Sequence, residues 1–328
     1  MEILIITCIL GIVFYLIYQT LPSTKFDRAK VLFNKGNFLD ALSTLESIID
    51  DHPDAPAKIA EIKIRQGLEQ INNNEETALS FFNQVLDQKK KLSKKSNRTL
   101  YEKYEAKANY EISKLEFYKI VPLKPTESKL IKITNNIKFI DEAIKQDLED
   151  DFLQLKLKHL ALLSDVHYEF GIQDEKAGNL TDAISNYSKS INFAQKSSTS
   201  KLIKESVCRT EICKLKRGEK PDINKLPEIA KSPKKFQNDF YYRYSIKLIY
   251  DGRFDQADFL ITNYLDLRNT HVSRLKKIIT IEKQNKAIQL ISGINQKLEK
   301  LYKDSFPIND VNELYENLNS WNAFIKKV

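Results

Sequence analysis

The stretch His167–Lys196, HYEFGIQDEKAGNLTDAISNYSKSINFAQK, predicts two helices joined by a tight turn around Gly178. In the second helix, Ala183 and Tyr187 lie four residues apart and therefore on one face. Gly171 lies late in the first helix, and Ala183 lies early in the second. We expect these two small residues to let the two helix backbones approach each other closely.

Three other windows carry the same pattern of a turn, a pivotal alanine and a following apolar face. The pivotal alanines of the four windows are Ala41, Ala78, Ala183 and Ala257. The intervals between them are 37, 105 and 74 residues, close to one, three and two periods of 35 to 37. The chain thus resembles the tetratricopeptide-repeat superfamily, whose 34-residue unit has small, small and aromatic positions matched here by Gly171, Ala183 and Tyr187.

The composition agrees with an all-α chain. Its 328 residues contain only 8 glycines and 9 prolines, and strand-like alternation is missing. We expect an N-terminal transmembrane helix followed by a TPR-like α-solenoid of helix hairpins with a C-terminal capping helix. The predicted parts are an anchor at 1–21, repeats at 22–217, a proline-containing loop or hinge at 218–233, and a further repeat with capping helices at 234–328. The last helix, 311–325, serves as the end cap, or alternatively docks a partner.

The N-terminal apolar segment, residues 3–21, predicts a retained membrane anchor. Residues 3–18 carry no charge, and nineteen helical residues span roughly 28 Å, about the thickness of a bilayer core. A cleaved signal peptide would need a basic start and a small-x-small site, which are missing. A lipoprotein at Cys8 is disfavoured because Thr7 precedes it.

Flanking charge predicts the orientation of this anchor. Lys25, Arg28, Lys30 and Lys35 follow it, whereas only Glu2 and the amino terminus precede it. We therefore expect a single-pass protein with its N-terminus outside and its body in the cytoplasm, at a bacterial inner membrane or its equivalent. This layout is similar to that of the lipopolysaccharide assembly protein B family, but the four-cysteine, rubredoxin-like metal module of that family has no counterpart here, so its activity is not carried over.

A basic segment and the predicted groove supply the candidate contact residues. The net charge is +8, and the segment 88–98 holds six basic residues. It is either a solvated helix end or an anionic-surface contact through Lys89, Lys90, Lys91, Lys94 and Lys95. Repeat geometry predicts a partner-binding groove lined by Tyr242, Arg243, Ile246 and Lys247, and by Tyr168, Ile172 and Glu175 in the organising repeat. The alternative is that these are ordinary exposed helix residues.

We expect no catalytic residue, cofactor or metal site. The glycines are too scattered for a phosphate-binding loop, and the three cysteines make no disulfide framework. The leading hypothesis is a membrane-anchored scaffold or adaptor, attached to the bilayer through residues 3–21, that binds a partner protein and helps assemble or recruit to a membrane complex. The alternatives are a nucleic-acid-binding helical-repeat protein, which is less favoured because no basic stripe is interleaved with aromatics, and an envelope or periplasmic scaffold with an uncleaved signal anchor.

Overall fold

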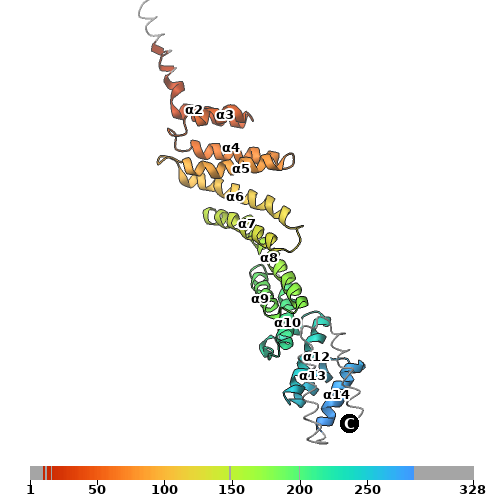
Figure 1. Ribbon diagram of the computed structural model, residues 1–328. Helices are drawn as coiled ribbons and strands as arrows, with labels where there is room; N and C mark the ends of the chain where they lie inside the picture. Colours follow the sequence, from red (N-terminus) through yellow and green to blue (C-terminus); the bar gives the residue numbers. More distant parts are fainter. Residues whose placement is uncertain (1–9, 12, 16, 148, 199, 284–328) are drawn as a thin grey trace, which may run out of the picture. The chain divides into compact units, whose positions relative to one another are not determined.

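The computed structural model describes residues 10–11, 13–15, 17–147, 149–198 and 200–283. In this part of the chain all regular structure is helical and helix packing recurs, which confirms the predicted all-α class (Figure 1). Residues 3–9, 12 and 16 of the predicted anchor, 3–21, and the whole predicted capping helix, 311–325, lie outside the described residues. Among the helices described, none combines the length and apolarity needed to cross a membrane.

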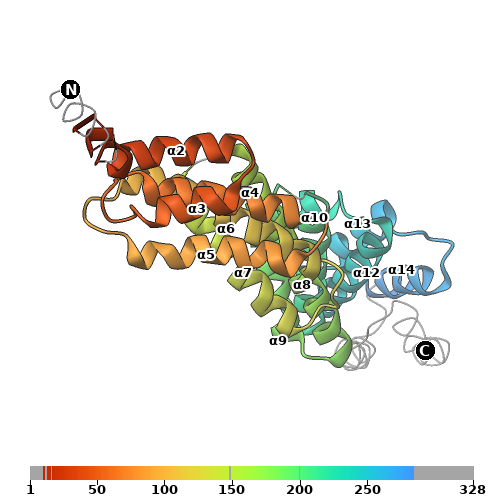
Figure 2. The ribbon, with the colours of Figure 1, turned by 90° about the horizontal axis from the view of Figure 1, so that it is seen from above.

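The chain divides into two compact units. Unit 1 comprises residues 1–123 and 131–159, and unit 2 comprises residues 124–130 and 160–328. The helices of unit 1 are α2 (Pro22–Asn34), α3 (Phe38–Glu46), α4 (Ala55–Gln70), α5 (Glu75–Gln88), η1 (Lys89–Lys91), α6 (Arg98–Ile120), most of α7 (Glu127–Gln146) and the start of α8 (Asp150–Ala177). From α2 to α6 consecutive helices pack side by side, and α4 also packs against α6 (Figure 2). Residues of α6, α7 and α8 share one core cluster.

Unit 2 continues the same style of packing. After the rest of α8 its helices are α9 (Leu180–Lys196), α10 (Ser200–Lys216), η2 (Ile223–Lys225), α11 (Leu226–Ile229), α12 (Lys234–Tyr250), α13 (Phe254–Tyr264) and α14 (Thr270–Lys283). α10 packs against both α9 and α12, and α13 packs against α12 and α14. The segment 218–233 is not wholly irregular, because η2 and α11 lie in it and Ile229 is buried in the core.

The four pivotal alanines occupy equivalent places in four hairpins. Each lies near the start of the second helix of its pair (α3, α5, α9 and α13) and is fully buried. The residue four positions later is also fully buried in every case. These residues are Leu45, Phe82, Tyr187 and Ile261. The interval of four places both side chains on the face that packs against the first helix.

The turns inside three of these hairpins share one backbone geometry. Gly36, Gly178 and Gly252 each follow the first helix with φ between +72° and +82°, a conformation that other L-residues seldom adopt. The next residue donates its backbone N–H to a carbonyl five positions earlier, as from Asn179 to Asp174 at 2.9 Å. This is the Schellman motif, which satisfies the last carbonyls of the helix while reversing the chain.

Close approach of the two helices depends on glycine in two hairpins. A Cβ built on Gly171 would lie 2.5 Å from the Tyr187 ring, and one built on Gly67 would lie 2.5 Å from the Phe82 ring. The aromatic ring therefore fills the space that any side chain at the glycine would need. The sequence predicted close approach through the small residues Gly171 and Ala183, and the structure adds that the Tyr187 ring lies against Gly171.

Replacing Gly171 with alanine tests this contact. In an open helix interior the change would stabilise by about 1 kcal/mol, because alanine has the higher helix propensity. Here the new Cβ overlaps the Tyr187 ring, so we expect the free energy of unfolding to fall by about 1–3 kcal/mol, measured by urea denaturation.

Glu169→Ala is the matched control, since Glu169 is exposed on the same helix. Its free energy of unfolding should stay within about 0.5 kcal/mol of the parent. A stabilised Gly171→Ala variant would show that α8 and α9 do not touch as described.

Candidate functional site

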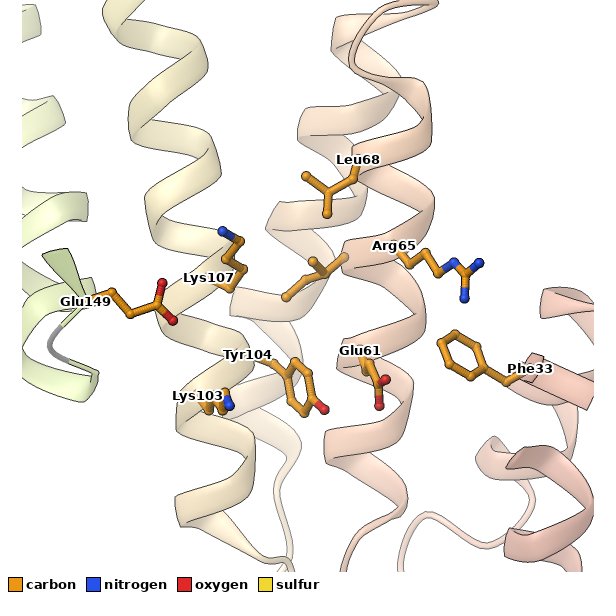
Figure 3. A pocket seen from close by; sticks show the side chains of 9 residues that line it. Phe33, Glu61, Arg65, Leu68, Lys103, Tyr104, Lys107 and Glu149 are labelled. Atoms are coloured by element: carbon orange, nitrogen blue, oxygen red, sulfur yellow. The ribbon is translucent and has the colours of Figure 1, made fainter. Parts of the chain in front are cut away.

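A cavity of about 370 Å³ opens on the side of unit 1 formed by α2, α4 and α6 (Figure 3). Each of these is the first helix of a successive pair, so the cavity crosses the packed hairpins. Its volume is at the low end of the range for small-ligand pockets. The lining residues are Phe33, Glu61, Ile64, Arg65, Leu68, Lys103, Tyr104, Lys107 and Glu149.

Helical spacing explains why these side chains meet. Four lining residues of α4, from Glu61 to Leu68, lie at intervals of three, one and three, which is one face of a helix. Lys103 and Lys107 are one turn apart on α6 and flank Tyr104. On its own helix, neither set of residues indicates a binding site. The packing of α4 against α6 brings the two sets together on one surface.

The floor of the cavity is mainly apolar and aromatic, with one ordered polar pair. The Tyr104 phenol lies beside the Glu61 carboxylate, and Figure 3 shows the two side chains facing each other. Burial first, and then the Glu61 carboxylate, raises the pKa of Tyr104 to about 12. The phenol is therefore protonated at neutral pH. Glu61 is also paired with Lys58 at 2.8 Å, so its charge is compensated on the protein itself.

Three cations, Arg65, Lys103 and Lys107, and the carboxylates of Glu61 and Glu149 border this apolar floor. The Arg65 guanidinium lies 5.2 Å from the centre of the Phe33 ring and 5.4 Å from that of Phe38. Half of its side chain is exposed, and its Nε lies 3.5 Å from the Glu69 carboxylate. Lys103 is exposed. Lys107 lies 3.3 Å from Glu111. Arg65 and Lys107 are thus paired on the protein, which leaves the exposed Lys103 to meet an incoming carboxylate. An apolar floor beside such a cation suits a ligand that combines a large apolar group with a carboxylate.

Sequence reasoning missed this cavity. The groove predicted from the repeat geometry covers only the helix pairs around Ala183 and Ala257. The same mapping applied to the first three pairs would have placed the α4 and α6 residues together. The available signal was the combination of Tyr104 with basic residues one turn apart.

The structure corrects the predicted groove positions in the organising repeat. Tyr168 and Glu175 are buried, at 8% and 6% exposure, and Ile172 packs against the same core cluster. The prediction treated this face of α8 as open. Instead, α10 covers it, and its Arg209 lies 5.7 Å from the centre of the Tyr168 ring.

Glu175 is the centre of a buried polar network that joins α8, α9 and α10. Its carboxylate accepts hydrogen bonds from Lys216 Nζ at 2.9 Å, Arg209 Nη1 at 2.8 Å and Tyr187 Oη at 2.8 Å. Lys216 is completely buried. Burial alone would raise the pKa of Glu175, but the two cations and their hydrogen bonds outweigh it and hold that pKa below its usual value.

The structure also corrects the predicted contact patch on α12. Tyr242, Arg243, Ile246 and Lys247 are buried, with exposures of 0%, 2%, 2% and 8%. Tyr242 and Ile246 belong to a core cluster contributed by α10, α12, α13 and α14. α12 is therefore a central helix of unit 2.

The two charges on α12 pair along the same helix. Arg243 pairs with Asp239 at 2.6 Å, and Lys247 pairs with Asp251 at 2.6 Å. Such pairing within one helix lets both cations lie in the packed interior. Tyr241, Tyr244 and Leu248 of the same helix are buried as well.

The basic segment lies at the surface of unit 1. Lys89 pairs with Glu105 at 2.9 Å, and Lys90 pairs with Asp87 at 3.1 Å. Lys91, Lys94 and Lys95 are exposed. These positions are compatible with either prediction for this segment.

The two described cysteines are unsuited to reaction chemistry. Cys208 and Cys213 are free and fully buried. Burial raises the pKa of the Cys208 thiol to about 12 and that of Cys213 higher still. Across residues 10–283, within the ranges described, no group of three or more potential metal ligands occurs.

We compared the chain with known protein families and curated proteins. No family model matches the chain, and no curated protein matches its sequence.

Glu175→Gln should destabilise the protein strongly, because it leaves the buried Lys216 ammonium without its counter-charge. We expect the free energy of unfolding to fall by about 3–5 kcal/mol near neutral pH. The lowered pKa of Glu175 sets the pH dependence. The stability that Glu175 contributes is fully present above about pH 4.3, the pKa of glutamate in the unfolded chain. It is lost as the pH falls through the lower pKa of Glu175 in the folded protein.

The double variant Glu175→Gln/Lys216→Met removes the unpaired charge as well and should recover part of this loss. Urea denaturation at neutral pH compares the two variants with Glu169→Gln, an exposed change on the same helix. If the double variant is less stable than the single one, the ion pair is not the source of the effect.

Proposed function

We propose that this protein is a membrane-anchored scaffold of tetratricopeptide-like helix pairs that binds a segment of a partner protein in the cavity of unit 1. The equivalent placement of Ala41, Ala78, Ala183 and Ala257 in four helix pairs supports the repeat architecture. Repeats of this kind stack helix pairs and offer extended surfaces for binding.

The observation that carries this proposal is the cavity lined by the first helices of three successive pairs. Its floor of Phe33, Ile64, Leu68 and Tyr104 would receive a large apolar side chain. Arg65 and Lys103 at the rim would attract a neighbouring Asp or Glu of the partner. The aromatic floor and the arginine are residue types that often anchor interfaces.

The N-terminal segment supports attachment to a bilayer. The described residues from Leu10 to Leu21 expose large apolar side chains, with Phe14 at 70% and Tyr15 at 62% exposure. A helix with such a surface is stable when lipid covers it. The basic residues that follow, Lys25, Arg28, Lys30 and Lys35, favour a cytoplasmic body.

The role that follows is recruitment or assembly. A scaffold held at the membrane would raise the local concentration of its partner beside a membrane complex. Binding of an acidic amphipathic segment accounts for both the apolar floor and the cationic rim without any chemical step.

Charge reversal at the cavity rim tests this function. Peptides selected from a display library on the purified full chain should share a large apolar residue next to an acidic one. Lys103→Glu should raise the Kd of such a peptide at least tenfold, about 1.4 kcal/mol, as measured by fluorescence anisotropy.

Lys138→Glu makes the same charge change on an exposed part of α7, outside the cavity lining. Its Kd should stay within about twofold of the parent if rim contact, rather than net charge, decides binding. Equal weakening by both variants, or no weakening by Lys103→Glu, would reject the cavity as the binding site.

A further inference from the structure

Three segments that are distant in sequence meet at one end of unit 1. They are the first turns of α2, the connection 47–54 before α4, and the loop 89–97 before α6. The His52 ring stacks on the Phe26 ring of α2, with centroids 3.9 Å apart. The Asn97 N–H donates to the Pro53 carbonyl at 2.8 Å, and its side-chain amide donates to Asp54 at 3.0 Å. The loop is therefore fixed beside the point where α2 begins.

Figures 1 and 2 both show this arrangement. The helix that leads into α2 leaves unit 1 at the same end as the connections before α4 and α6. The turn between α4 and α5, residues 71–74, lies at the opposite end of those two helices. Unit 1 therefore has one end next to the N-terminal apolar helix and one end away from it.

The end next to the apolar helix carries an excess of cations. We call it the basic edge and define it by Lys25, Arg28, Lys91, Lys94, Lys95 and Arg98. In the described structure these side chains form no ion pair, whereas Lys89 and Lys90 beside them do. Acidic residues also occur here, namely Asp50 and Asp51, which are exposed, and Asp54, which accepts from Asn97. Asp27 and Asp87 lie here too but pair with Lys30 and Lys90, and Glu102 is exposed one turn beyond Arg98. The six cations outnumber the four carboxylates that form no ion pair within the described ranges, Asp50, Asp51, Asp54 and Glu102, and leave a positive surface.

We infer that the basic edge contacts the anionic headgroups of the bilayer that holds the N-terminal helix. This inference rests on the membrane attachment proposed above. An anionic leaflet attracts basic segments close to it, and the attraction fades within a Debye length. The basic edge meets this requirement because it adjoins the apolar helix. The contact holds unit 1 with its basic edge toward the lipid and its 71–74 turn away from it.

The binding cavity would stay accessible in this orientation. Its α4 residues, Glu61 to Leu68, begin about 1.7 turns beyond the start of the helix at Ala55, and its first α6 residue, Lys103, lies about 1.4 turns beyond Arg98. The lipid contact and the partner contact therefore use different parts of unit 1. This separation lets one be tested without disturbing the other.

Fluorescence quenching by headgroup-labelled lipid tests the contact in the full chain. Thr99→Cys, exposed in the first turn of α6, would carry a fluorophore beside the basic edge in a Cys8→Ser background. Asn73→Cys, exposed in the opposite turn, is the matched control. The buried Cys208 and Cys213 should stay unlabelled. The vesicles contain phosphatidylcholine, alone or with about a third phosphatidylglycerol, and a spin-labelled headgroup.

In the anionic vesicles we expect the Thr99 label to be quenched at least about twice as strongly as the Asn73 label. The difference should vanish in phosphatidylcholine alone, at about 0.5 M salt, and in the Lys94→Gln/Lys95→Gln/Arg98→Gln variant. Circular dichroism checks that this variant keeps its helicity.

Flotation of the same vesicles separates the two possible failures. A chain that does not float with the vesicles contradicts the proposed membrane attachment. A chain that floats but shows equal quenching at both positions, or equal quenching with and without anionic lipid, contradicts the basic edge alone.

Discussion

The rest of the structure depends on close contact between the two helices of each pair. In two pairs the contact requires a glycine, because the Tyr187 or Phe82 ring occupies the place of a side chain at Gly171 or Gly67. A ring seated on bare backbone fixes both the separation of the helices and their register along each other. Successive pairs with the same register then present their first helices on the same side, and in unit 1 that side holds the cavity.

The local parts of this arrangement could be predicted from the sequence. The period of the pivotal alanines and the glycine turns depend on neighbouring residues, so both are visible in the chain itself. Ala41, Ala78, Ala183 and Ala257 are all fully buried at equivalent places. Close approach of the two helices at Gly171 also followed from its place in the pattern, although its contact with the Tyr187 ring did not. These features depend only on residues within a single helix pair.

The outer faces of the pairs could not be predicted in the same way. Arg243 and Glu175 have side chains that usually prefer water, so the sequence favoured an exposed groove at their positions. They are buried because distant or neighbouring residues supply counter-charges, as Lys216 and Arg209 do for Glu175. Whether a charged residue is buried depends on which helix covers it, and that information lies about 40 residues along the chain. The cavity itself was missed because Glu61 and Tyr104 meet only after two pairs have stacked.

The length of α4 sets the distance between the two proposed contact sites, the basic edge and the cavity. At 1.5 Å per residue, the cavity residues Glu61 and Leu68 stand roughly 10–20 Å from the start of the helix at the basic edge. Under the proposed lipid contact and partner binding, a membrane-embedded partner would have to span that height with its own chain to reach the cavity. An extended chain covers about 3.3–3.6 Å per residue, so about three to six residues between the partner's membrane segment and its apolar anchor are enough. The length of this tether would discriminate among partners even where their binding sequences are alike.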